Sequence, residues 1–158
     1  MANFTNVEER VETSSERRIR IFLAVLFFIQ TIMTTFPFIQ GTVEVDGKEG
    51  YGNLTAFNLL VNPSGYQGTG AIPYAVVGGI LVVFPIVAFF FCVLDTKSRV
   101  KFVISGLCAV VSAMLITFTM AGIIAIGAVL TLVDNVLCLF MSAQGFQATT
   151  IRMKNTGK

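Results

Sequence analysis

Long apolar segments separated by short polar ones dominate the hydrophobic pattern of the chain. Residues 19–38, 73–94 and 102–141 contain only two charged side chains between them, Arg20 and Asp134. An α-helix of about 20 residues covers the roughly 30 Å hydrocarbon core of a bilayer. The pattern therefore predicts transmembrane helices at residues 19–38 and 73–94.

The third apolar segment is about twice as long as one span requires. We therefore predict two antiparallel helices within it, at residues 102–120 and 124–143, joined by a tight apolar turn. Gly122 and Gly127 are the expected breakpoints, because glycine departs from helical geometry at low cost. The predicted fold class is an all-α membrane protein, an antiparallel bundle of four transmembrane helices that forms one membrane domain over residues 1–158.

The first apolar segment has a second interpretation, a cleaved signal peptide. It follows a polar stretch of mixed charge at residues 1–18. The apolar part is longer than the usual hydrophobic region of a signal peptide, however, and no A-x-A-like cleavage site follows it. We therefore expect residues 19–38 to remain as the first span.

A polar loop at residues 39–72 connects the first two predicted spans. Alternating residues at 42–46 lead into Asp46-Gly47, a strong two-residue turn signal, and this predicts a β-hairpin. Residues 53–61 carry apolar side chains at helical spacing, which is typical of a short helix lying in the membrane interface. The candidate recognition residues of this loop are Asp46, Gly47, Tyr51 and Phe57.

The basic residues predict the orientation of the spans. Ten of the eleven Lys and Arg residues lie in or next to the N-terminal segment 1–18, in the link 95–101, or in the tail 144–158. Lys48, in the loop 39–72, is the exception. Because Lys and Arg favour the cytoplasmic ends of short loops, we predict a protein of the cell membrane with both termini in the cytoplasm and the loop 39–72 outside. Three spans would place the basic tail on the opposite side.

The composition supports a membrane protein and argues against other classes. Hydrophobic residues make up 54% of the chain and charged residues 13%, against about 45–50% and 25% in soluble domains. The net charge of +2 is too small to indicate a nucleic-acid partner. Cys92, Cys108 and Cys138 lie in or at the edge of apolar segments without a CxxC motif, so we interpret them as packing residues.

Motifs for catalysis and for cofactors are missing from the sequence. The chain has no His, which excludes His-based metal sites and catalytic triads. It also lacks a glycine-rich phosphate loop and a GxSxG motif. We therefore expect neither an enzyme nor a bound cofactor or metal.

An intramembrane carboxylate, Asp134, is the strongest candidate for a functional site, and Asn135 follows it directly. Placing an ionisable residue in a bilayer costs a few kcal/mol or more, so its default interpretation is a functional or partner contact. Counted at about 1.5 Å per residue from the cytoplasmic ends, Gln30, Pro85, Ser112 and Asp134 all fall near the midplane. We predict a polar layer there.

Two details of this layer stay open in the sequence. Pro85 leaves the carbonyl of Leu81 without its helical donor and so offers an acceptor. A structural interpretation of Asp134 has comparable weight, with a neutral carboxyl hydrogen-bonded to Gln30 or Ser112. If Asp134 is charged, its counter-charge must come from a bound cation or from another subunit.

These features lead to two functional hypotheses. The first is a small non-catalytic subunit or accessory component that contacts the lipid bilayer and packs against another membrane subunit or against copies of itself. The second is a small ion- or proton-coupled transporter or channel in which Asp134 binds the ion. The environment of Asp134 distinguishes them, because a transporter must let water or an ion reach this carboxyl group.

Overall fold

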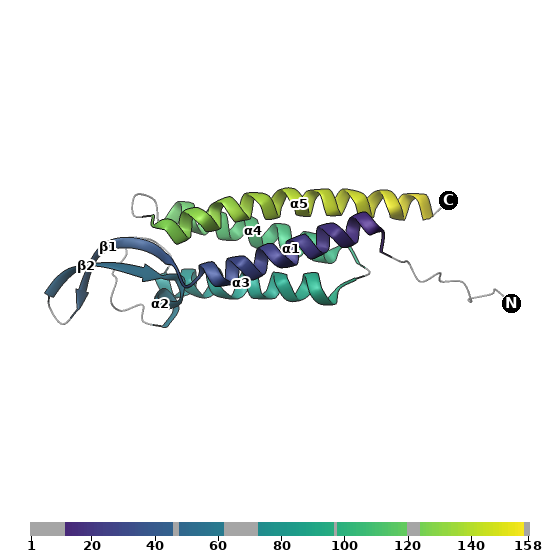
Figure 1. Cartoon of the computed structure of the whole chain (residues 1–158). Helices are drawn as coiled ribbons and strands as arrows, with labels where there is room; N and C mark the ends of the chain where they lie inside the picture. Colours follow the sequence, from purple (N-terminus) through teal and green to yellow (C-terminus); the bar gives the residue numbers. More distant parts are fainter. Residues whose placement is uncertain (1–11, 46–47, 62–72, 97, 120–123, 157–158) are drawn as a thin grey trace.

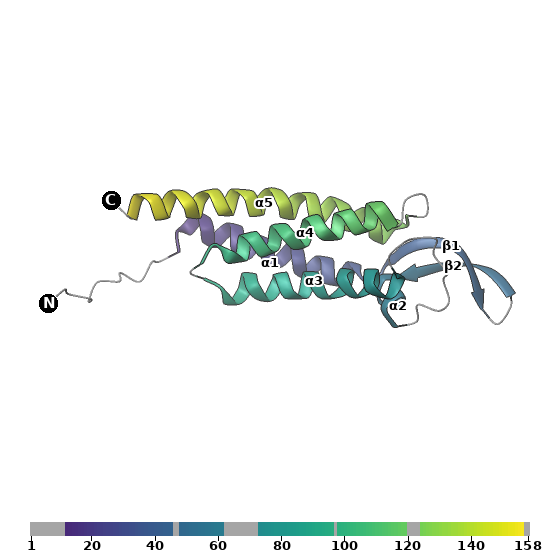
Figure 2. The same ribbon diagram turned by 180° about the vertical axis from the view of Figure 1, so that it is seen from behind.

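A computed structural model describes residues 12–45, 48–61, 73–96, 98–119 and 124–156 of the chain. Its long helices are α1 (Ser14–Met33), α3 (Tyr74–Leu94), α4 (Val100–Thr119) and α5 (Ile126–Thr156). α1 and α4 each pack against both α3 and α5 (Figures 1 and 2). The start of α1 and the end of α5 lie at one end of this helix arrangement, and the elements that stand between α1 and α3 in the chain lie at the other end.

Three helices of the described residues are long and apolar enough to cross a membrane, namely α3, α4 and α5. They lie at the places where the hydrophobic pattern predicts spans. α1 is also 20 residues long, but it carries four charged residues in its first two turns. Its apolar part is therefore shorter than that of the other three.

The first helix begins and ends about five residues earlier than the predicted span 19–38. Thr13 and Glu16 form a capping box, in which each side chain accepts a hydrogen bond from the other's backbone N–H, at 3.3 and 3.1 Å. Pro37 disfavours helical geometry at the residue before it, and α1 accordingly stops at Met33. The two ends are thus determined by local signals that lie outside the apolar pattern.

The predicted β-hairpin is confirmed and is longer than the alternation indicates. β1 (Pro37–Val45) and β2 (Lys48–Thr55) pair antiparallel, with Val45 opposite Lys48 and Pro37 opposite Thr55. The predicted Asp46-Gly47 turn lies outside the described residues. Because β2 continues to Thr55, the helix predicted at 53–61 is reduced to α2 (Ala56–Val61), whose Asn58 N–H donates to Thr55 Oγ1 at 3.0 Å.

The hairpin is attached to the start of α5. The N–H of Ala125 donates to the carbonyl of Phe38 at 2.9 Å, and Ile39 forms a β-bridge with Ile124. Gly127 is therefore not the breakpoint that the sequence predicts, because it is the second residue of α5. A Cβ at this position would lie 2.7 Å from the carbonyl oxygen of Pro37, so glycine is what lets β1 approach the helix. The other expected breakpoint, Gly122, lies outside the described residues.

The last helix extends well past the predicted span 124–143. α5 has 31 residues and includes most of the polar tail predicted at 144–158. Gly145 and Thr149 are buried on one side of this extension. A Cβ on Gly145 would overlap the ring of Phe102, so glycine is what allows the two helices to approach there. The extension packs on the start of α4 and so remains part of the fold.

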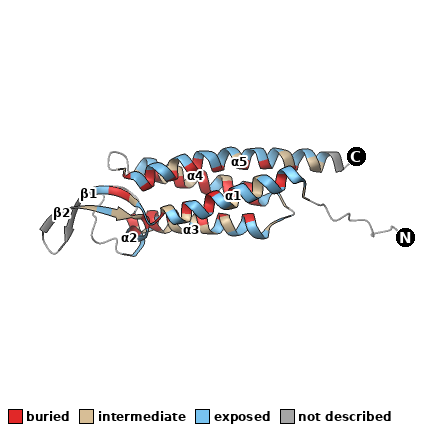
Figure 3. Ribbon diagram, in the orientation of Figure 1, coloured by how far each residue is buried: buried red, intermediate tan, exposed pale blue. Residues whose placement is uncertain are grey.

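Buried apolar side chains line the inward sides of the long helices, whereas the outward sides are exposed (Figure 3). They form two clusters. The hairpin-side cluster consists of Phe38, Ile39, Ala56, Leu59, Tyr74, Val77, Leu81, Ile116 and Ala128. The terminal-side cluster consists of Leu23, Leu26, Phe27, Ala88, Cys92, Phe102, Cys108, Ala109 and Cys138.

Two adjacent glycines of α3 test how closely α2 packs on it. A Cβ on Gly78 would lie 2.6 Å from the backbone N of Leu60, so we expect Gly78→Ala to displace α2 and to destabilise the fold by about 1–3 kcal/mol. A Cβ on Gly79 meets only the side chain of Leu60, at 3.6 Å, so Gly79→Ala should be neutral or slightly stabilising. Unfolding of both variants in detergent measures the difference, and equal stabilities would contradict this packing.

Candidate functional site

A layer of buried polar side chains separates the two apolar clusters. Each long helix contributes a residue to this layer. In the sequence, that residue follows members of one apolar cluster and precedes members of the other. Each of these side chains is buried, the exposed fraction of the Asp134 residue being 5%. The polar side chains of this layer are Gln30 in α1, Ser112 in α4, and Thr131, Asp134 and Asn135 in α5. α3 contributes the buried apolar residue Pro85 at the same place between the clusters.

A hydrogen bond between side chains crosses this layer. The Gln30 amide nitrogen donates to Asn135 Oδ1 at 2.9 Å, and both residues are buried. The two residues are 105 positions apart in the sequence, so the bond ties the last turn of α1 to the first half of α5. Interhelical side-chain hydrogen bonds of this kind contribute about 0.6–2 kcal/mol in membrane proteins.

Asp134 points into the packed helices and not outward. Its Oδ2 accepts a hydrogen bond from the Cys138 thiol at 3.6 Å, one turn further along α5. None of the ion pairs formed by the described residues includes Asp134. The structural interpretation of Asp134 expects a hydrogen bond to Gln30 or Ser112. Among the described residues Asp134 instead bonds to Cys138, and Gln30 bonds to the neighbouring Asn135.

The polar layer retains unused hydrogen-bonding capacity. Gln30 Oε1, Asn135 Nδ2 and Thr131 Oγ1 are buried and have no hydrogen-bond partner among the described residues. Each such group costs about 1–3 kcal/mol if it stays unsatisfied, and a bound water or ion is a common explanation. An amide oxygen, an amide N–H group and a hydroxyl together match the chemistry of a water molecule or a hydrated ion.

The predicted recognition residues of the loop are spread over different elements. Tyr51 lies in β2 opposite Thr42, and Phe57 lies in α2 with 53% of its surface exposed. Asp46 and Gly47 lie outside the described residues. Phe57 is therefore the candidate whose side chain the structure places on the surface.

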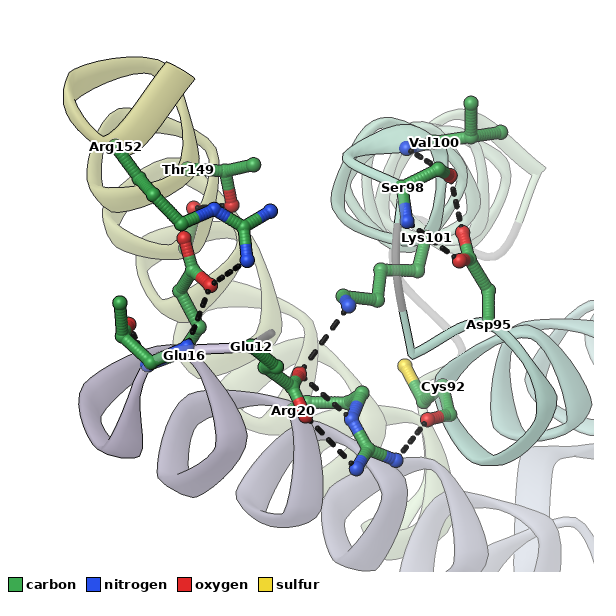
Figure 4. Close-up of polar contacts among 12 residues, drawn as sticks. Glu12, Glu16, Arg20, Cys92, Asp95, Ser98, Val100, Lys101, Thr149 and Arg152 are labelled. Carbon is green, nitrogen blue, oxygen red and sulfur yellow. Dashed lines mark hydrogen bonds and ion pairs between the residues drawn. The ribbon is translucent and has the colours of Figure 1, made fainter. Parts of the chain in front are cut away.

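A second polar site, which the sequence did not predict, lies at the end of the long helices that is opposite the hairpin (Figure 4). This charged cluster consists of Glu12, Glu16, Arg20, Lys101 and Arg152. Glu12 lies just before α1, and the other members come from the start of α1, the start of α4 and the end of α5. Three basic and two acidic side chains therefore meet where the helix ends converge.

Glu12 is the centre of one part of the charged cluster. Its two carboxylate oxygens accept from Arg20 Nε at 2.8 Å and Nη2 at 3.1 Å, and one of them also accepts from Lys101 Nζ at 3.2 Å. Arg20 further donates to the carbonyl of Cys92, in the last turn of α3, at 2.9 Å. A single carboxylate thus connects α1 to α4, and through Arg20 to α3.

Glu16 and Arg152 form the other part. Arg152 Nη1 lies 2.9 Å from Glu16 Oε2, and the two side chains are 13% and 2% exposed. The pair joins the first turn of α1 to the end of α5. Burying charged groups to this extent is costly unless their partners are present, and removal of Glu16 takes this carboxylate away from Arg152.

Local sequence signals could have located only part of the charged cluster. Thr13-x-x-Glu16 matches the capping-box pattern and marks the start of α1. Lys101 and Glu12, by contrast, are 89 residues apart, and nothing in either segment shows that they meet. From the sequence alone, Lys101 therefore indicates only the orientation of the predicted spans.

Comparison with known proteins identifies no relative. No family model, no curated protein and no solved structure matches the chain. Within the described ranges, no group of three or more His, Cys, Asp or Glu side chains could hold a metal ion. A function must therefore be argued from the site itself.

The Glu16–Arg152 pair gives a direct test of the charged cluster. Glu16→Gln keeps the shape of the side chain and its capping acceptor but leaves Arg152 without this carboxylate, so we expect a loss of roughly 2–4 kcal/mol of stability. The double variant Glu16→Gln/Arg152→Gln should recover part of that loss. Arg17→Gln, an exposed change on the same turn, is the control, and equal unfolding of Glu16→Gln and Arg17→Gln would refute the role of the pair.

Proposed function

We propose that this chain is a non-catalytic multi-pass membrane protein that serves as a subunit of a membrane complex or of a homo-oligomer. In this proposal the long helices form an antiparallel bundle with four spans. The supporting observation is the apolar outward surface of these helices, on which Phe28 of α1 is 55% exposed and Val136 of α5 is 67% exposed. Such a surface suits contact with lipid or with other apolar helices.

α1 is proposed as the fourth span despite its charged residues. It packs against α3 and α5 along its length, and Phe22, Val25 and Ile32 are each about half exposed on its outward side. Glu16 and Arg20 turn inward to the charged cluster, where they are paired. The charges of α1 therefore gather at one end, where a span would meet the headgroups.

The charge distribution supports the orientation with both termini in the cytoplasm. Arg20, Lys101 and Arg152 meet at the end of the long helices that carries the start of α1 and the end of α5. Lys48 belongs to the hairpin at the other end. In the proposed orientation the basic end faces the cytoplasm, and the hairpin and α2 face outward.

The environment of Asp134 favours the subunit over a transporter. Asp134 is 5% exposed, and the Gln30–Asn135 bond closes the layer beside it. The surface has a groove lined by residues of α4 and α5, such as Gly106 and Ser142, and another lined by residues of α3, such as Val87 and Phe91. Asp134 lines neither groove. On this reading the polar layer holds α1 in place, and partner recognition falls to exposed elements such as α2.

A proton- or ion-coupled transporter is the second candidate, and one observation favours it. The unpartnered atoms of Gln30, Asn135 and Thr131 give the polar layer capacity for a water molecule or an ion next to Asp134. A pathway through the layer would require the Gln30–Asn135 bond to open. Transport then needs several copies of the chain or a different arrangement of the helices.

Mass measurement of the protein purified in mild detergent tests the proposed function. We expect an assembly larger than one chain, either of several copies or with a co-purified partner, and a monodisperse monomer would count against the proposal. Asp134→Asn should leave this assembly intact if the residue packs inside the chain. Proteoliposomes prepared in parallel test the second candidate, since ion flux that disappears in Asp134→Asn would favour a transporter.

A further inference from the structure

A surface groove of about 430 Å³ runs between α4 and α5 on their outward side. Small residues allow this depth: Gly106 faces Ser142, and a Cβ on Gly106 would lie 3.6 Å from the Ser142 Cβ. Leu107, Val110 and Leu139 supply apolar walls. The volume falls within the roughly 300–1,000 Å³ typical of small-molecule sites, and the lining is almost wholly apolar.

A cation stands at the end of this groove nearest the chain termini. Arg99, just before α4, places its guanidinium 5.6 Å from the ring centroid of Phe146, which lines the groove. Arg99 is exposed and forms no ion pair with any described residue. It differs in this from Arg20, Lys101 and Arg152, whose charges are paired in the charged cluster.

A buried hydroxyl lies between the cation and the apolar part of the groove. Ser142 lines the groove and is 3% exposed, and its Oγ has no hydrogen-bond partner among the described residues. The Ser142 oxygen is enclosed by the protein, so this residue narrows the groove and does not offer a donor to a bound molecule. The groove thus offers, in order from its end, a positive charge and an apolar channel.

The groove along α3 provides a contrast within the same molecule. It is also apolar, being lined by Val87, Phe90, Phe91 and Leu94, but it ends at the carboxylate of Asp95. Among the described residues, a cation stands at the end of the α4–α5 groove, whereas a carboxylate stands at the end of the α3 groove.

We propose that the α4–α5 groove binds one acyl chain of an anionic phospholipid. The acyl chain lies over Gly106, and the phosphate pairs with Arg99. The cytoplasmic leaflet is rich in anionic lipids, which matches the proposed orientation. The inference rests on the membrane placement of the proposed function.

Lipid retention measured by native mass spectrometry tests the headgroup contact. The purified full chain is mixed with phosphatidylglycerol or phosphatidylcholine of identical acyl chains, and we expect preferential retention of phosphatidylglycerol. Arg99→Gln should lower that retention about fivefold. Arg18→Gln, which removes an exposed Arg of α1 at the same end, should leave it unchanged. Equal retention of the two lipids by the wild-type chain, or an equal effect of both variants, would overturn the proposal.

Variants of the groove itself test the acyl-chain contact. Gly106→Leu should fill the channel and reduce retention, whereas Val87→Phe in the α3 groove should not. Unchanged phosphatidylglycerol retention in Gly106→Leu would overturn the proposal. A shift from oligomer to monomer without loss of lipid would also overturn it and would identify the groove as a protein interface. Arg99→Gln decides if Gly106→Leu fails to fold. Release of the protein from membranes by alkaline carbonate would instead refute the proposed membrane placement.

Discussion

The carboxylate of Glu12 holds together two cations that the packed helices otherwise bury without compensation. It bonds Arg20 through two hydrogen bonds and Lys101 through a third, and Arg20 continues to the backbone of α3. In surroundings with little water, a polar group must find its partner within the protein. This constraint explains why the start of α1, the least apolar of the long helices, is fixed to α3 and α4 at one end and through Glu16 to α5.

A related constraint operates between the two apolar clusters with uncharged groups. Gln30 donates one hydrogen bond to Asn135 across the polar layer, and Asp134 turns inward to Cys138. Apolar clusters lie on both sides of the layer, so polar contacts specify how α1 and α5 align while apolar contacts supply most of the packing. The outward surface of the long helices instead exposes apolar side chains, and in our proposal lipid or a partner covers it.

Prediction from the sequence succeeded where the signal was local. Apolar length located α3, α4 and α5, and alternation before Asp46-Gly47 located the hairpin. Counting residues from the helix ends predicted a common depth for Gln30 and Asp134; both residues are buried, and Gln30 bonds to Asn135, the neighbour of Asp134. The functional role of these residues remains a prediction.

Prediction failed where the signal depends on tertiary contact. The charged cluster joins segments that are 89 residues apart, and no pattern near Glu12 points to Lys101. Gly78 and Gly79 look equivalent in the sequence, yet only Gly78 lies against the backbone of α2. Gly127 resembles a breakpoint but serves the close approach of β1. In each case the deciding neighbour comes from elsewhere in the chain.

Thiol labelling with a membrane-impermeant maleimide tests most directly the proposal that the long helices cross the membrane four times. Cys92, Cys108 and Cys138 are buried, so the unmodified chain should give little background. Single cysteines at Arg18, Lys48 and Lys154 probe the two termini and the hairpin. The account predicts that Lys48→Cys reacts in intact cells, and that Arg18→Cys and Lys154→Cys react only after the membrane is opened. Labelling of Arg18→Cys and Lys154→Cys on opposite sides would contradict it.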